Sequence, residues 1–101
     1  MQTQLSLKAI DEEISICQSF VDKYEEELTE AKSQLISLTE RIEVLKELDK
    51  VLPDGKSKRY NSEDLKDLAN ERMELIPEIK SLQSKIEHFQ TLIQGLNQLK
   101  E

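Results

Sequence analysis

Residues 7–45, LKAIDEEISICQSFVDKYEEELTEAKSQLISLTERIEVL, decide the fold of this chain. Their apolar residues recur at alternating steps of three and four from Leu7 to Leu45 without a break. This is the a/d pattern of a coiled-coil seam, a narrow apolar stripe along one side of a helix. Because such a stripe does not stabilise an isolated helix in water, this helix must lie against another one. The seam positions are Leu7, Ile10, Ile14, Cys17, Val21, Tyr24, Leu28, Ala31, Leu35, Leu38, Ile42 and Leu45.

A second seam follows in the C-terminal part of the chain. It has one polar interruption, Arg72, at an a position, where a basic residue costs stability but can fix the register. We expect Asn61 or Ser62 to cap this helix. Pro77 lies at an outer f position, where we expect a kink or a short break, because proline removes a backbone hydrogen bond. The seam positions are Leu65, Leu68, Arg72, Leu75, Ile79, Leu82, Ile86, Phe89, Ile93 and Leu96.

The segment Pro53-Asp54-Gly55 is a turn signal between the two seams. Proline sets φ at the first turn position and glycine accepts a positive φ. With Thr3 as a plausible N-cap, the sequence predicts a single helical domain over residues 1–101. Its first helix spans about 4–51, its turn about 52–61, and its second helix about 62–100 with a kink near 77.

So short a connection makes the two helices antiparallel neighbours. Pairing Leu45 with Leu68 keeps the two seams in phase as far as Cys17 and Leu96. In this register Ile42 faces Arg72, and Glu43 is close enough to reach the guanidinium. The predicted fold is therefore all-α, an antiparallel two-helix coiled-coil hairpin, and we expect two hairpins to associate into a four-helix bundle.

Seven apolar residues at the open end of the predicted hairpin lie outside the paired part of the seams. Three of them, in the first turns of helix one, project past the end of helix two, and four others occupy c or g positions on one flank. Contiguous apolar sets of this kind indicate an interface, although the flank residues could simply broaden the intrachain seam. The predicted protein-interface residues are Leu5, Leu7, Ile10, Ile16, Phe20, Leu92 and Leu99. A smaller apolar set, Val44, Leu48 and Val51, lies near the turn.

The composition restricts the classes of partner. The chain of 101 residues is 35% charged and has a net charge of −7, so its surface should repel nucleic acid and anionic membranes. One basic cluster, Lys56, Lys58 and Arg59, is expected in a solvated loop. With no secretory signal and no long apolar run, we expect an intracellular, cytoplasmic protein.

No residue set in the sequence indicates catalysis, a cofactor or a metal. The two glycines are isolated, so there is no glycine-rich phosphate loop. His88 is the only histidine and is expected to be exposed, and Cys17 is the only cysteine, at a d position where it acts as a small apolar residue. We therefore expect a protein that is not an enzyme.

Two resemblances accompany this prediction. The helix–loop–helix layout is similar to the subunits of prefoldin, whose paired helices hold unfolded clients, but residues 52–61 are too short for the β-hairpins of that family. Tyr60, with Glu71, Met73, Ile76 and Pro77 on the following helix, resembles the middle helix of tubulin-binding cofactor A, a family of small helical bundles that bind β-tubulin. The fold prediction rests on the seams and not on either resemblance.

Three functional hypotheses follow. The leading one is a non-enzymatic interaction protein, an assembly subunit, adaptor or inhibitor, that binds a protein partner or a second copy through helix surface. The second is a chaperone-like client holder resembling prefoldin or tubulin-binding cofactor A. The third is an acidic mimic of nucleic acid that inhibits a DNA-binding protein, which regularly spaced carboxylates on one flank would favour.

Overall fold

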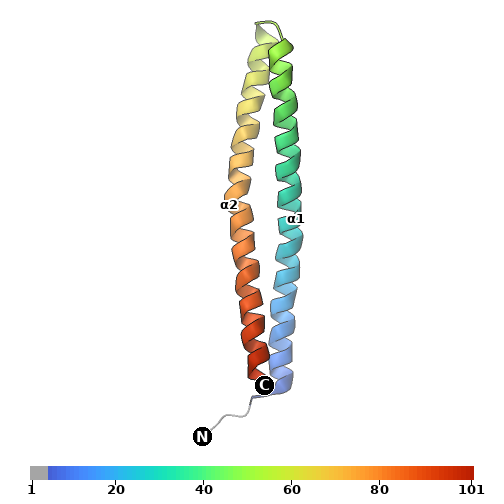
Figure 1. The fold of residues 1–101 in the computed structure, drawn as a ribbon, viewed down its shortest axis with the longest axis vertical. Coiled ribbons are helices and arrows are strands. Elements are labelled where there is room, and N and C mark those ends of the chain that lie inside the picture. Colours follow the sequence, from blue (N-terminus) through green and yellow to red (C-terminus); the bar gives the residue numbers. More distant parts are fainter. Residues whose placement is uncertain (1–4) are drawn as a thin grey trace. The chain divides into compact units, whose positions relative to one another are not determined.

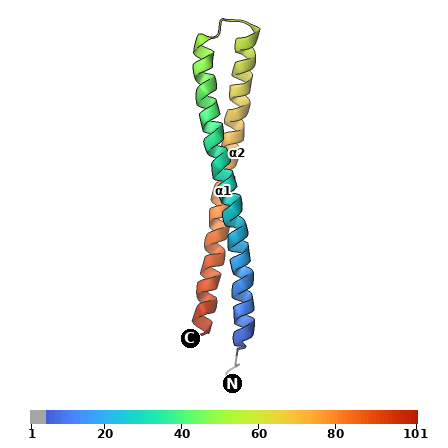
Figure 2. The same ribbon diagram turned by 90° about the vertical axis from the view of Figure 1, so that its right-hand side faces the viewer.

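The computed structural model, which describes residues 5–101, is an all-α helical hairpin, as predicted. Helix α1 spans Leu7–Val51 and helix α2 spans Lys56–Leu99. The residues divide into two units: unit 1 is formed by Met1–Leu28 with Lys80–Glu101, and unit 2 by Thr29–Ile79. In each unit a segment of α1 runs antiparallel to a segment of α2 (Figures 1 and 2).

Helix α1 begins at Leu7, later than predicted, because Ser6 caps it. The Ala9 N–H donates a hydrogen bond to Ser6 Oγ at 3.2 Å, and the Ile10 N–H donates to the Ser6 carbonyl at 3.0 Å. The Ser6 hydroxyl thus satisfies a backbone donor that has no partner within the helix. The predicted cap, Thr3, lies outside the described residues.

The turn is shorter than the sequence suggested. The Leu52 N–H still donates to the Leu48 carbonyl at 3.1 Å, and the Arg59 N–H already donates to the Gly55 carbonyl at 3.1 Å. Gly55 has a φ of 146°, the positive value expected for the turn glycine. Helix α2 therefore starts at Lys56, and the basic cluster that we expected in a loop forms its first turn.

Asn61 is consequently inside α2 and does not cap it. It is 6% exposed. Its Nδ2 donates to the Leu45 carbonyl at 3.0 Å and lies 3.4 Å from Asp49 Oδ1. Asn61 precedes Leu65 by four residues, so it extends the α2 seam by one position with a polar side chain that is hydrogen-bonded across the helix pair.

The two predicted seams form the cores of both units. Every seam residue from Ile10 to Leu45, and from Leu65 to Leu96, is buried or half-buried. In unit 1 the rings of Tyr24 and Phe89 lie 6.0 Å apart, as the predicted register requires. The most buried apolar residues are Ile10, Cys17, Val21, Leu82 and Ile86 in unit 1, and Ala31, Ile42, Leu68 and Leu75 in unit 2.

At Pro77 and Arg72 the structure of α2 differs from what the sequence predicted. The helix continues through Pro77, so the short break considered from the sequence does not occur. Arg72 is half-buried at its seam position. The ion pairs of residues 5–101 do not include the expected contact between Arg72 and Glu43.

Candidate interaction surface

Unit 1 contains an uncharged stretch of each helix. Helix α1 has no Asp, Glu, Lys or Arg over residues 14–21, and α2 has none over residues 88–99. The two stretches lie side by side, because Phe20 stacks on Phe89 and because Cys17 and Leu96 line one groove. A second surface could cover this part of unit 1 without desolvating a charge, and depletion of charge is typical of interface cores.

A shallow groove of about 380 Å³ runs along this part of unit 1, with one charged residue, Glu13, in its lining. Its lining residues come from both helices: Glu13, Cys17, Thr91, Leu92, Gly95, Leu96 and Leu99. A Cβ atom added to Gly95 would meet nothing within 4 Å. The fold itself therefore does not require a glycine there, although glycine costs about 1 kcal/mol in a helix relative to alanine. The missing side chain leaves room between Leu92 and Leu99.

Near this groove, the Phe20 side chain packs against other aromatic rings. Its ring stacks on Phe89 at a centroid distance of 4.9 Å and on Tyr24 at 6.2 Å, and His88 meets Phe89 edge-on at 5.3 Å. Lys85 Nζ lies 5.3 Å from the Tyr24 ring centroid. Stacking fixes the orientation of Phe20, which remains 38% exposed, so little side-chain entropy is lost when a partner covers it.

The two flanks of unit 1 differ in polarity. The flank formed by c and g positions carries Ile16, Phe20, Leu92 and Leu99, which are 38% to 54% exposed, and we name these four residues the apolar flank. Within the uncharged stretches, the e positions of the opposite flank carry Gln18, Gln90 and Asn97. An apolar set on one side and amides on the other give unit 1 one face suited to contact and one suited to water.

Three of the predicted interface residues lie apart from the apolar flank. Leu5 and Leu7 are exposed before and at the start of α1, as expected. We had predicted that Ile10 is uncovered, and this is wrong: Ile10 belongs to the core and is 6% exposed. The C-terminal end of the chain reaches the level of Ile10, since Lys100, which follows α2, pairs through its Nζ with Asp11 Oδ1 at 2.7 Å. The lysine stem can cover apolar surface while its ammonium group stays in water.

The groove residues Glu13, Thr91 and Gly95 were missed by the sequence reasoning. Gly95 lies three residues after Leu92 and four before Leu99, the spacing of a second helical stripe. That spacing, together with the uncharged run 88–99, was the signal that could have identified the groove.

Comparison with known proteins adds nothing to this geometry, since no family model, curated protein or solved structure matches the chain. Within residues 5–101, no group of three or more His, Cys, Asp and Glu side chains could hold a metal ion. In the same part of the chain, neither helix combines the length and the apolar character that crossing a membrane requires.

Proposed function

We propose that this protein is a non-enzymatic assembly subunit that associates with a second copy of itself through the apolar flank. The observation that supports this proposal is the position of four exposed apolar side chains beside a groove, on helix segments without charged residues. Two chains of net charge −7 repel each other over most of their surface. They can approach most closely where neither carries a charge.

A two-fold axis through the apolar flank would place the same four residues of both copies against each other. The pair of helices from each copy would then form a four-helix arrangement over unit 1. Burying the remaining exposed half of each large apolar side chain contributes on the order of 1 kcal/mol. Eight such side chains contribute about 8 kcal/mol together, and association costs at least about 4 kcal/mol, so we expect a weak dimer with a Kd of about 1 mM or higher.

The test uses Ile16→Asp and Phe20→Asp. Phe20 also stacks on Phe89, so its replacement should cost some stability, whereas Ile16 has no ring contact to lose. The matched control is Val44→Asp, an exposed β-branched residue of unit 2. Light scattering at high salt should give a dimer for the wild type and for the control, and a monomer for both variants. Circular dichroism should show similar helicity in all four proteins.

A monomeric wild type at high concentration would refute the proposal, and so would an Ile16→Asp variant that dimerises as well as the wild type. Tight binding of unfolded clients by the apolar flank of a monomer would instead support the chaperone-like hypothesis. The nucleic-acid mimic is the weaker proposal, because one flank of unit 2 carries exposed lysines and an arginine, which a mimic of an anionic polymer would not have.

A further inference from the structure

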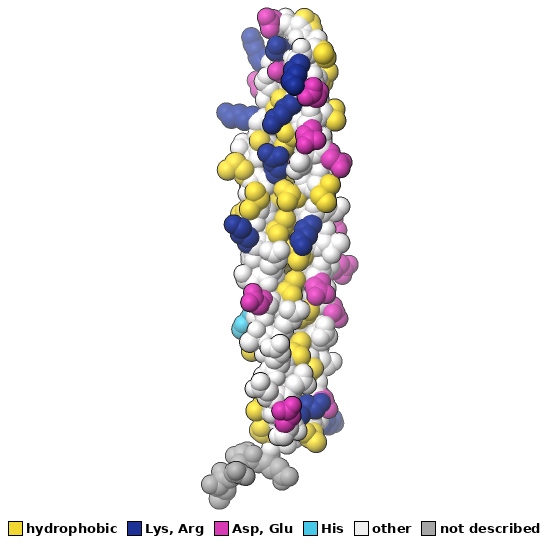
Figure 3. Space-filling model, viewed as in Figure 1, with side chains coloured by type: hydrophobic (Ala, Val, Ile, Leu, Met, Phe, Trp, Pro, Cys, Tyr) yellow, Lys and Arg dark blue, Asp and Glu magenta, His cyan; other side chains and the backbone are white. Residues whose placement is uncertain are grey.

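Unit 2 has two flanks of opposite charge. The basic flank is formed by exposed cations at b and e positions: Lys32, Lys46, Lys50, Arg59 and Lys66. The acidic flank is formed by exposed carboxylates at c and g positions: Glu30, Asp64, Asp67, Glu71, Glu74 and Glu78. Each flank has one exception, Glu43 on the basic side and Arg41 on the acidic side. Figure 3 shows a face on which Lys and Arg side chains gather over the unit 2 part of the chain.

The basic flank also carries an apolar projection. Ile36, Met73 and Ile76 occupy b and e positions and are 44% to 68% exposed. We name these three residues the knob. They lie on the same flank as Lys32, Lys46 and Lys66. Large apolar side chains in the middle of a basic surface favour an acidic surface that also has an apolar centre.

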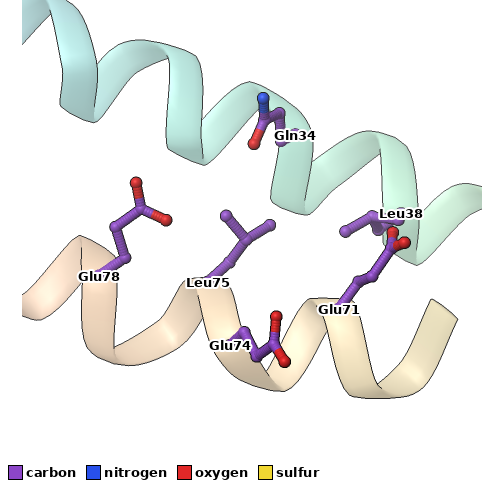
Figure 4. A pocket seen from close by; sticks show the side chains of 6 residues that line it. All are labelled: Gln34, Leu38, Glu71, Glu74, Leu75 and Glu78. Carbon is purple, nitrogen blue, oxygen red and sulfur yellow. The ribbon is translucent and has the colours of Figure 1, made fainter. Parts of the chain in front are cut away.

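The acidic flank contains a recess of that kind. A groove of about 230 Å³ is lined by Gln34 and Leu38 from α1 and by Glu71, Glu74, Leu75 and Glu78 from α2. Figure 4 shows Leu75 extending from α2 toward α1, with Glu71 and Glu78 on either side of it. We name this groove the socket. It has an apolar floor, Leu38 and Leu75, and a rim of three carboxylates.

The knob and the socket lie at the same level of unit 2, on opposite flanks. Ile36 stands between Gln34 and Leu38 in α1, and Met73 and Ile76 alternate with the socket glutamates in α2. The helical period of 3.6 residues turns neighbouring residues to different sides while the rise between them stays small. A translation across the width of unit 2 would therefore bring the knob of one copy to the socket of the next.

We propose that a second copy of this chain occupies the socket, with the knob inside it and the basic flank against the glutamate rim. The occupant is assigned by complementarity, because the same unit carries both an apolar projection on a basic flank and an apolar recess with a rim of carboxylates. The contact is heterologous, since each copy uses two different surfaces, and it leaves one knob and one socket free at the ends of a row. It is independent of the dimer through the apolar flank.

Such a contact should be weak and sensitive to salt. Exposed ion pairs contribute little individually and are screened at high ionic strength. The net charge of −7 opposes association of any two copies. Rows should therefore form at high protein concentration and low salt, and dissociate when salt is added.

A charge exchange between the two flanks tests the proposal. All proteins carry Ile16→Asp, so that association through the apolar flank does not contribute. The first variant adds Lys46→Glu and Lys66→Glu, which removes the net positive charge of the basic flank and leaves the acidic flank unaltered. The second adds Glu74→Lys and Glu78→Lys, which removes most of the net negative charge of the acidic flank and leaves the basic flank unaltered. Sedimentation velocity is measured for each protein alone and for an equimolar mixture, at low and at high salt.

The parent should self-associate at low salt and sediment as a monomer at high salt. Each charge variant alone should lose at least about tenfold in association constant, which is a change of about 1.4 kcal/mol. The mixture should recover association, because acidic flanks of one variant meet basic flanks of the other. A third variant, Ile36→Glu in the parent, should weaken association without altering the net charge of the socket rim.

A parent that stays monomeric at low salt overturns the proposal, as does a mixture that fails to associate while both variants remain helical by circular dichroism. These outcomes leave the dimer proposal untouched, because that dimer uses unit 1 and is measured in wild-type protein at high salt. Conversely, loss of the wild-type dimer would not affect the result obtained in the Ile16→Asp background.

Discussion

A single buried amide connects the helices of unit 2 near the turn. Asn61 Nδ2 donates to the Leu45 carbonyl at 3.0 Å and approaches Asp49 Oδ1 at 3.4 Å. Leu45 also accepts the helical bond from residue 49, so its carbonyl takes a second donor from the other helix. A polar side chain at a seam position satisfies these bonds in one register only, and shifting the helices by one turn would leave the amide buried without partners.

We predict that Asn61→Ala lowers the free energy of unfolding by about 1–2 kcal/mol, because it removes these hydrogen bonds and leaves a gap in the seam. Urea denaturation followed by circular dichroism measures the change. The control is Asn70→Ala, at an exposed f position of the same helix, which gains the same helix propensity without losing a contact. If the two variants unfold at the same urea concentration, the amide does not hold the register.

Helix α2 contains two residues that weaken a helix, and both are in exposed positions. Pro77 lies at an f position and lacks the N–H that would reach the Met73 carbonyl, yet the helix is continuous on both sides. Continuity follows from the seam, because Leu75 is buried and Ile79 half-buried, and their packing holds the backbone in place. Gly95 lies in the groove of unit 1. The helix thus depends on its contacts with α1 more than on its own propensity.

We predict that Pro77→Ala stabilises the protein, by up to about 3 kcal/mol, because alanine restores the backbone hydrogen bond and relieves crowding with the preceding turn. Thermal unfolding should shift to higher temperature. Ser84→Ala, at the next outer f position, controls for the general effect of alanine and should give less than about 0.5 kcal/mol. An unchanged or lower midpoint for Pro77→Ala would mean that the proline is compensated by the surrounding structure.

At the scale of the whole molecule, the exposed surface is specialised along the chain. The apolar flank of unit 1 carries no charge, whereas unit 2 presents separate acidic and basic flanks. Apolar contacts are insensitive to salt and ionic contacts are not. The two proposed associations therefore respond differently to ionic strength, and either can be measured while the other is suppressed.

We predict that the thermal midpoint of the wild type rises with protein concentration at high salt, since a dimer that only the folded chain forms stabilises the fold by mass action. Ile16→Asp should have a midpoint that is independent of concentration under the same conditions. Calorimetry at two concentrations that differ tenfold measures both proteins. Identical behaviour of wild type and variant would contradict a dimer through the apolar flank.

The secondary structure class, the two seams and their register follow from the spacing of apolar residues along the chain. A strict three-four alternation of apolar residues is compatible with one arrangement only. A helix places those residues on one side, and a second helix is needed to cover so narrow a stripe. The half-burial of Arg72, at an a position, follows from this period alone. The apolar flank was also predictable, since its four residues fall on c and g positions of segments that the register places together.

Three features depend on contacts within the folded chain: the start of α2, the hydrogen bonds of Asn61 and the burial of Ile10. Local capping preference favoured a helix start at Asn61, but contact with α1 outweighs that preference and draws the amide into the seam. Likewise, Ile10 is buried next to Asp11, which pairs with Lys100, a residue distant in sequence. The knob and the socket required the structure too, because the depth of a groove depends on side-chain packing between two helices, which the spacing of residues along one helix does not specify.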